Sequence, residues 1–164
     1  MSGKTWERTP VRFFGQHLQR LDAKRRVVVP RKLRDLIGEQ ELRSGLFVTR
    51  GFDKCLFLFP SSLWEAVAAE FSLGHFTGFN ARMLQRLFFS EAVNVEPDKL
   101  GRVLLPDRLL ALASIEDEVL FVGASNRVEL WSPSLWAALK EAHEQQYEEL
   151  AEALYQLLQS REAK

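Results

Sequence analysis

The chain has 164 residues, 46% of them hydrophobic, and its 22 lysines and arginines balance its 22 aspartates and glutamates. A chain of this length forms one domain of ordinary size or two small halves around a shared core. It lacks an apolar run of the roughly 20 residues that a membrane-spanning helix needs, and its N-terminus lacks the apolar segment of a signal peptide. A single cysteine, Cys55, excludes a disulfide framework and favours a reducing compartment.

The charges are unevenly distributed although they sum to zero. Residues 1–34 hold ten bases and two acids, whereas acids predominate from Lys140 onward. A basic segment of this kind favours a polyanionic partner. For residues 1–12 we expect only a solvated, disordered segment. The bases between residues 20 and 34 are different, because they belong to a repeated motif.

The first half of the chain predicts short strands and helices in alternation. Three consecutive valines favour a strand buried on both faces, and Pro30 suits the start of the helix that follows. Ser62 and Glu65 have the spacing of a capping box. In chain order we expect a strand over 13–21, a tight turn over 22–25, a strand over 26–29, a helix over 31–37 ended by Gly38, hairpin strands over 46–50 and 55–59, and a helix from Ser62.

The second half predicts the same succession after a linker over residues 71–79. The expected elements are a helix capped by Asn80 with Met83, Leu84, Leu87 and Phe88 on one side, a strand over 91–95, a turn over 97–101, a strand over 102–105, a helix over 107–113, and hairpin strands over 119–122 and 127–131. Ser132 and Pro133 begin a last helix. Its apolar stripe packs either on other helices of this chain or on a neighbouring subunit. The stripe consists of Trp136, Leu139, His143, Tyr147, Leu150, Leu154 and Leu157.

Two long segments of the sequence repeat each other. Residues 22–33 and 98–109 both read Asp-x-x-x-Arg, three apolar residues, Pro, two polar residues and Leu. Residues 51–64 and 123–136 repeat as well. An internal repeat indicates two similar structural units, whatever the assignment of the individual helices and strands. Two half-domains in one chain indicate a covalent pseudo-dimer.

The aspartate and the arginine of the repeated motif have a spacing suited to a tight turn. A carboxylate at the start of a turn accepts hydrogen bonds from backbone N–H groups two or three residues later. The same carboxylate can hold the arginine extended, so that its guanidinium is aimed at a phosphate or a guanine edge. In the alternative, the two side chains only pin the turn or pair across a subunit boundary.

The two copies of the motif differ in local charge. The first copy has Lys24, Arg25 and Arg26 in succession, whereas acids such as Glu96 and Asp107 dilute the second. We therefore expect the first copy to carry more of the salt dependence of DNA binding. The candidate DNA-binding residues are Asp22, Lys24, Arg25, Arg26, Arg31, Asp98, Lys99 and Arg102.

The paired motifs resemble those of swapped-hairpin, AbrB-like DNA-binding barrels, and about residues 13–158 are similar to the MraZ family. The similarity includes Asn80-Ala-Arg-Met-Leu-Gln-Arg between the halves and Val128-Glu-Leu-Trp at the end of the second hairpin. The resemblance implies an α+β fold in which two AbrB-like repeats form one intrachain pseudo-dimeric β-barrel flanked by helices. The implied domains are SpoVT-AbrB-like repeat 1 over 13–62, linker helices over 63–88, repeat 2 over 89–134 and a C-terminal helix over 135–158.

The function that this resemblance implies is transcriptional regulation. Members of the family are bacterial regulators of the division and cell-wall gene cluster. The implied protein binds double-stranded DNA at promoter direct repeats, including those of its own gene, and acts most simply as a repressor. It forms a ring-shaped homo-oligomer and is cytoplasmic and nucleoid-associated, with no membrane and no small-molecule substrate. The alternative is an oligomeric scaffold or antitoxin-like interaction module without specific DNA readout.

One position departs from the pattern of this family, which has glycine directly before the motif arginine. Gly101 keeps it in the second copy, whereas the first copy has Arg25, which costs about 1 kcal/mol if the turn requires a positive φ. Catalysis is not expected, because the chain has no phosphate-binding glycine loop and no nucleophile elbow. The three histidines lack the spacing of metal ligands, so we expect no metal and no cofactor. Cys55 is expected to be a small buried hydrophobe.

Overall fold

The computed structural model describes residues 12–72 and 78–162. Residues 1–11 of the expected solvated segment and most of the expected linker over 71–79 lie outside the described residues. The chain divides into two compact units, Met1–Ser132 and Pro133–Lys164.

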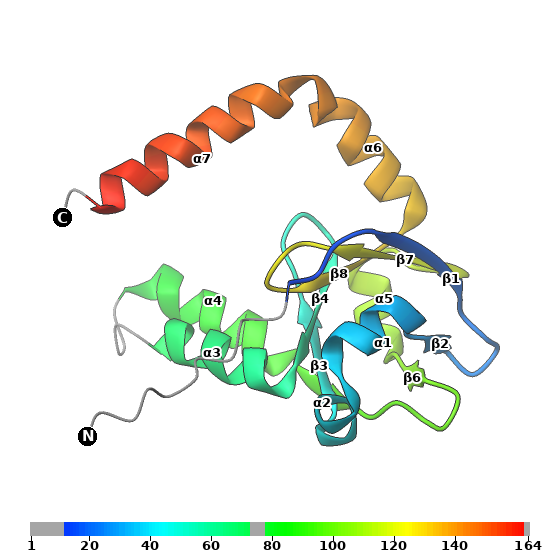
Figure 1. Ribbon diagram of the computed structural model, residues 1–164. Coiled ribbons are helices and arrows are strands. Elements are labelled where there is room, and N and C mark those ends of the chain that lie inside the picture. The colour runs from blue at the N-terminus through cyan, green and yellow to red at the C-terminus, as the bar shows by residue number, and fades with distance from the viewer. Residues whose placement is uncertain (1–11, 73–77, 163–164) are drawn as a thin grey trace, which may run out of the picture. The chain divides into compact units, whose positions relative to one another are not determined.

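The first unit contains eight strands and five α-helices in its described part (Figure 1). Most of them match the elements that the sequence predicts. In chain order they are β1 Gln16–Arg20, β2 Arg26–Val28, α1 Arg31–Ile37, α2 Glu39–Ser44, β3 Leu46–Arg50, β4 Leu56–Pro60, α3 Ser61–Ser72, α4 Phe79–Ser90, β5 Val93–Val95, β6 Arg102–Leu104, α5 Asp107–Leu112, β7 Glu118–Gly123 and β8 Val128–Trp131. The second unit contains α6 Pro133–His143, a 3-10 turn Glu144–Gln146 and α7 Tyr147–Glu162.

The strands of the two halves are interleaved. One antiparallel sheet has the order β1-β7-β8-β4-β3-β5, and β2 pairs with β6 in a separate two-stranded ribbon. Four pairings join a strand of the first half to a strand of the second: β1 to β7, β4 to β8, β3 to β5, and β2 to β6. Among the described strands neither sheet is closed. The mixed fold of helices and strands is therefore confirmed, whereas the predicted closed barrel is not.

The strand pairing has an internal twofold symmetry. If each strand is exchanged with its equivalent in the other half, for example β1 with β5 and β3 with β7, the result is the same strand order counted from the other edge of the sheet. Equivalent residues also meet each other at the centre of the ribbon, where Val27 is opposite Val103. Hydrogen bonds at the ribbon ends repeat the symmetry, since Val29 N donates to Gly101 O at 2.9 Å and Leu105 N donates to Arg25 O at 3.0 Å.

The core is built from both halves. Val27, Val103, Leu33 and Leu109 are equivalent pairs in the repeat, and each is at most 1% exposed. They belong to one cluster that also includes residues of the six-stranded sheet, such as Phe121. Because burying a valine or leucine side chain contributes about 1.5–3 kcal/mol, the contact between the halves is a main source of stability.

Three local features differ from the expectations. Helix α2 was not expected, because none of its residues is buried and its sequence has no apolar period. Helix α3 begins at Ser61, where Ser61 Oγ donates to Gly45 O at 2.9 Å, rather than at a capping box of Ser62. The predicted last helix is divided by the 3-10 turn at Glu144–Gln146, a polar segment in which no proline or glycine marks the break.

Substitutions in the ribbon should show which of its faces supports the fold. Val27→Ala should destabilise the protein by about 2 kcal/mol, because two buried carbons and their packing are lost. Val28→Ala is the matched control, since Val28 is the adjacent valine on the other face and is only half-buried. The measurement is chemical denaturation of both variants. Equal losses would contradict the packing described here.

Candidate nucleic-acid interface

A single carboxylate organises the first turn, residues 22–26. Asp22 Oδ1 accepts hydrogen bonds from the backbone N–H groups of Lys24 and Arg26, both at 2.9 Å. Asp22 Oδ2 accepts a third from Arg26 Nε at 2.8 Å. The backbone N–H of Asp22 donates to Arg26 O at 2.9 Å and closes the turn. The turn that the motif predicts is therefore confirmed.

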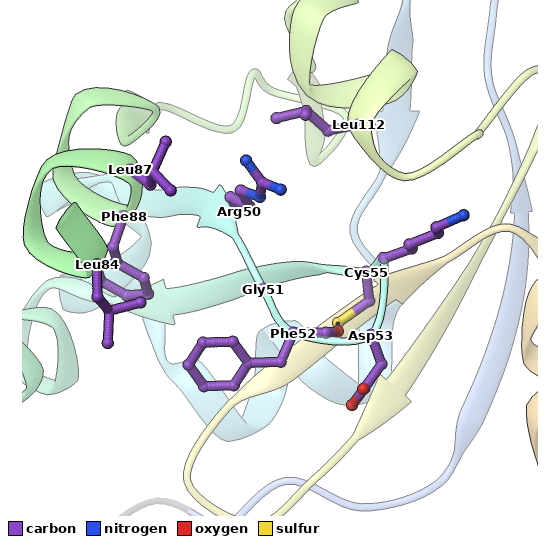
Figure 2. Close-up of a pocket in the computed structure, with 10 residues that line it drawn as sticks. Arg50, Gly51, Phe52, Asp53, Cys55, Leu84, Leu87, Phe88 and Leu112 are labelled. Carbon is purple, nitrogen blue, oxygen red and sulfur yellow. Dashed lines mark hydrogen bonds between the residues drawn. The ribbon is translucent and has the colours of Figure 1, made fainter. Parts of the chain in front are cut away.

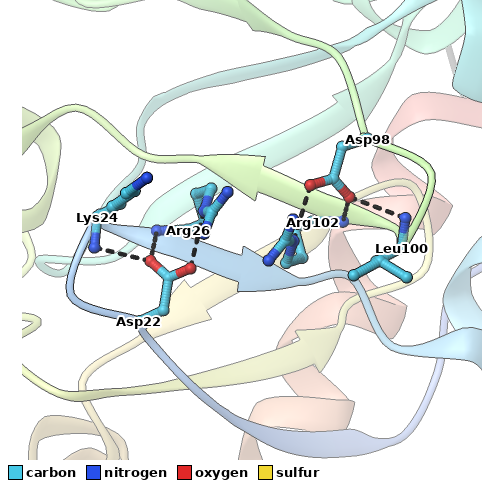
Figure 3. Close-up of polar contacts among 6 residues, drawn as sticks. All are labelled: Asp22, Lys24, Arg26, Asp98, Leu100 and Arg102. Carbon is cyan, nitrogen blue, oxygen red and sulfur yellow. Dashed lines mark hydrogen bonds and ion pairs between the residues drawn. The ribbon is translucent and has the colours of Figure 1, made fainter.

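The second turn, residues 98–102, repeats this geometry (Figure 3). Asp98 Oδ1 accepts from the backbone N–H groups of Leu100 and Arg102 at 3.0 and 2.9 Å, and Asp98 Oδ2 accepts from Arg102 Nε at 2.7 Å. The backbone N–H of Asp98 donates to Arg102 O at 2.9 Å. One rule therefore holds at both turns: one carboxylate oxygen shapes the backbone and the other holds the arginine.

Both motif arginines lie on the outer face of the ribbon. Side chains alternate along a strand, and Val27 and Val103 point into the core. Arg26 and Arg102 therefore lie on the opposite face, with side chains 30% and 29% exposed. Only Nε of each guanidinium has a partner among the described residues. The N–H groups of both terminal nitrogens remain available to a ligand.

The register determines how this outer face is composed. Arg26 pairs with Leu104, and Val28 pairs with Arg102. The two arginines therefore lie diagonally across the ribbon, with an apolar residue opposite each. Leu104 is 55% exposed, so the apolar part of the face is also accessible. A two-stranded antiparallel ribbon of this kind fits the major groove of B-DNA.

Arg25 has a different orientation from the other candidate cations. Its φ of 62° is close to the 78° of Gly101, so the first turn keeps its shape without glycine. The backbone at Arg25 therefore carries a strain of about 1 kcal/mol. Arg25 Nε lies 3.3 Å from Asp107 Oδ1, and Arg25 Nη1 donates to Glu116 O at 3.2 Å. The guanidinium of Arg25 is thus bonded within the chain.

The remaining candidate cations, Lys24, Arg31 and Lys99, are exposed. In the part of the chain that the structure describes, their side chains have no polar partner. Arg34, which the motif did not indicate as a candidate, has its guanidinium against the second turn. A Cβ at Gly101 would lie 2.7 Å from Arg34 Nη1. The repeat gave no sign of this contact, because the equivalent of Arg34 in the second half is Leu110.

A separate pocket of about 380 Å³ lies between the β3–β4 hairpin and α4 (Figure 2). Cys55 is in its lining and is 2% exposed. Burial raises the pKa of the Cys55 thiol to about 12, and Cys55 Sγ donates to Phe52 O at 3.2 Å. The thiol therefore stays protonated at neutral pH. This agrees with the expectation of a small buried hydrophobe.

Within residues 12–72 and 78–162, no three or more His, Cys, Asp or Glu side chains are grouped as a metal ion would require. None of the helices in these ranges combines the length and the apolar character needed to cross a membrane.

The fold and the site define a protein of two interleaved repeats, with an aspartate-held arginine at each end of a shared ribbon. The family model described as "MraZ protein, putative antitoxin-like" matches residues 13–87 and again residues 88–158. The chain belongs to the MraZ family. The resemblance inferred from the motifs is therefore confirmed.

Curated relatives cover most of the chain. A protein of Carboxydothermus hydrogenoformans is 40% identical over 146 residues, which are 89% of this chain and 99% of the relative. Proteins of Halothermothrix orenii and Desulfitobacterium hafniense are 36% and 38% identical over 145 residues, or 88% of this chain and 98% of each relative. All three are named "Transcriptional regulator MraZ".

Acid should weaken the two turns. The backbone N–H of Arg26, followed by its guanidinium, lowers the pKa of Asp22 below 3.8, and Arg102 lowers the pKa of Asp98 in the same way. A carboxyl whose pKa is lower in the folded state stabilises the fold above the unfolded pKa. That stabilisation is lost as the pH falls through the folded pKa.

The double variant Asp22→Asn/Asp98→Asn should therefore be less stable than the parent at neutral pH. It should lose less additional stability between about pH 5 and pH 2. Thermal unfolding across this range measures both effects. The control is Glu148→Gln/Glu149→Gln on the exposed surface of α7. The assignment fails if the Asn variant and the parent have the same acid dependence.

Proposed function

We propose that this protein is a transcriptional regulator that binds duplex DNA through the outer face of the β2–β6 ribbon. The observation that carries the proposal is the pair of arginines on that face, each held by its own aspartate, with both terminal nitrogens available. The names of the relatives support regulation of transcription. The function is binding without catalysis, since the relatives are named as regulators.

In this proposal the two aspartates do not contact DNA. A carboxylate repels phosphate, but it can fix the pose of an arginine before DNA arrives. Arg26 and Arg102 then lose little side-chain entropy on binding, because their side chains are already ordered in the free protein. Their terminal nitrogens can form two parallel hydrogen bonds to a phosphate or to O6 and N7 of a guanine. Lys24, Arg31 and Lys99 add phosphate contacts.

The finer proposal follows the family resemblance. The interleaved halves form an AbrB-like swapped-hairpin pseudo-dimer, with repeat 1 over 13–62, linker helices over 63–88, repeat 2 over 89–134 and the C-terminal helical segment over 135–158. The protein acts in the cytoplasm on nucleoid DNA. It represses the division and cell-wall gene cluster, including its own gene, by occupying direct repeats in the promoter.

Oligomerisation strengthens such binding. Helix α7 has an exposed apolar stripe of Tyr147, Leu150, Leu154 and Leu157, with exposed fractions between 51% and 76%. An exposed apolar stripe of this length is typical of an interaction surface. We propose that it packs on a neighbouring subunit of a ring-shaped homo-oligomer. Several weak ribbon contacts on successive repeats then add through effective concentration.

The second candidate function is an antitoxin-like interaction module whose Asp–Arg turns build only its own interfaces. The words "antitoxin-like" in the description of the family model favour it. Binding to duplex DNA distinguishes the two. A regulator prefers its own promoter to random DNA, and its affinity falls steeply with salt, whereas an interaction module shows neither behaviour.

Removing either motif arginine should weaken binding to promoter DNA. Arg26→Ala and Arg102→Ala should each reduce affinity roughly 5- to 150-fold, the range for loss of one bidentate contact. Gel-shift titration measures this, and solution mass should show an unchanged oligomer. Arg43→Ala is the control, because Arg43 is an exposed arginine on α2 with a weak ion pair to Glu39. Undiminished binding by Arg26→Ala would reject the assignment of the ribbon.

The stripe of α7 is tested separately. Leu150→Glu or Leu154→Glu should lower the solution mass or the folded fraction, because a charge is placed in an apolar contact. Gln159→Glu adds the same charge to the opposite side of α7 and should change neither. Light scattering and circular dichroism measure the two quantities. No change in either quantity for the leucine variants would contradict packing through the stripe.

A further inference from the structure

The two ends of the ribbon have different neighbours from those that the linear sequence indicates. At the second turn, Gly101 O accepts from Val29 N, and the guanidinium of Arg34 in α1 lies against Gly101. Helix α1 of the first half therefore lies beside the turn of the second half. Its basic residues are at the opposite end of the ribbon from the motif that precedes them in the sequence.

The same exchange occurs at the first turn. Arg25 O accepts from Leu105 N, and the side chain of Arg25 bonds to Asp107 at the start of α5. Helix α5 of the second half therefore lies beside the turn of the first half. Because β2 pairs with β6, each turn has the helix of the other half as its neighbour.

At each end, one arginine side chain lies between the turn and the neighbouring helix. At the second end this is Arg34, which comes from the helix and lies against Gly101. At the first end it is Arg25, which comes from the turn, and the position equivalent to Arg34 holds the buried Leu110. Arg25, which replaces the glycine in the first copy, therefore lies at the first end where Arg34 lies at the second end.

Arg25 and Arg34 differ in how they affect the net charge at their ends of the ribbon. Arg25 is bonded to the carboxylate of Asp107, whose side chain is 83% exposed. The residue equivalent to Asp107 at the other end is Arg31, a base. Seven equivalent positions are compared: 22–26, 107 and 110 at the first end, and 98–102, 31 and 34 at the second. The first set has three bases and two acids, and the second has four bases and one acid. The net charges are +1 and +3, respectively.

We propose that the second turn is the main phosphate-binding end of the ribbon, with a cluster of Arg31, Arg34, Lys99 and Arg102. At the other end Arg25 acts through Asp107: it neutralises this carboxylate, which would otherwise repel the phosphate backbone. The physical reason is that attraction to phosphate follows the local net charge. This proposal rests on the proposed binding of duplex DNA by the ribbon.

The first experiment compares single cations at the two ends. Lys99→Gln and Arg31→Gln remove exposed bases at the second end, and Lys24→Gln is the matched change at the first end. Promoter-duplex affinity is measured against salt concentration. For each ribbon in contact with the duplex, each of the first two variants should reduce the salt slope by about 0.9, and Lys24→Gln by less than half as much. An effect of Lys24→Gln that equals or exceeds that of Lys99→Gln overturns the proposal.

The second experiment tests the role of Arg25. Arg25→Gly should weaken duplex binding several-fold, because Asp107 loses its counter-ion. The double variant Arg25→Gly/Asp107→Asn should recover the affinity of the parent, and Asp107→Asn alone should bind at least as tightly as the parent. Thermal unfolding verifies that each variant is folded. A double variant that remains as weak as Arg25→Gly overturns the neutralising role.

The outcomes separate this proposal from the function on which it rests. A parent protein that binds duplex no better than the double variant Arg26→Ala/Arg102→Ala overturns the ribbon as the DNA-binding surface, and this proposal with it. A parent that binds through these two arginines, but loses equal salt dependence at both ends, overturns only the charge asymmetry.

Discussion

The pairing of β2 with β6 shapes both the core and the face that we propose binds DNA. Val27 and Val103 meet at the internal twofold and are buried, and strand alternation then places Arg26 and Arg102 on the outer face. A shift of one residue in the register would exchange the two sets and bury the arginines. This three-residue pairing, one of the four that join the halves, therefore also exposes the cations.

The aspartates of the motif serve the fold and the site together. Asp22 and Asp98 each use one oxygen for two backbone N–H groups and the other for an arginine. The same carboxylate therefore pins the turn and fixes the pose of the guanidinium. The backbone bonds also lower the pKa of both carboxyls, so the carboxylates stay ionised and hold the arginines to a lower pH than an ordinary aspartate would.

Local signals in the sequence predicted most elements of the repeat. Helix α1 has the bounds expected after Pro30, and β3 has those expected for the first hairpin strand. Short-range patterns were not sufficient where an element depends on contacts or lacks a marker. Helix α2 has no buried residue and therefore no helical period of apolar residues in its sequence. No proline or glycine marks the break before α7.

The sequence by itself determined that there are two equivalent halves and that each carries an aspartate-held arginine turn. The halves follow from the repeated sequence, and each turn depends on hydrogen bonds within five consecutive residues. Only the tertiary structure decided which charges surround each turn, because the strands pair across the halves. Arg34 therefore lies against Gly101, and Arg25 bonds to Asp107. The electrostatic field at a turn comes from its own residues and from its neighbours in space, and here the neighbouring helix belongs to the other half.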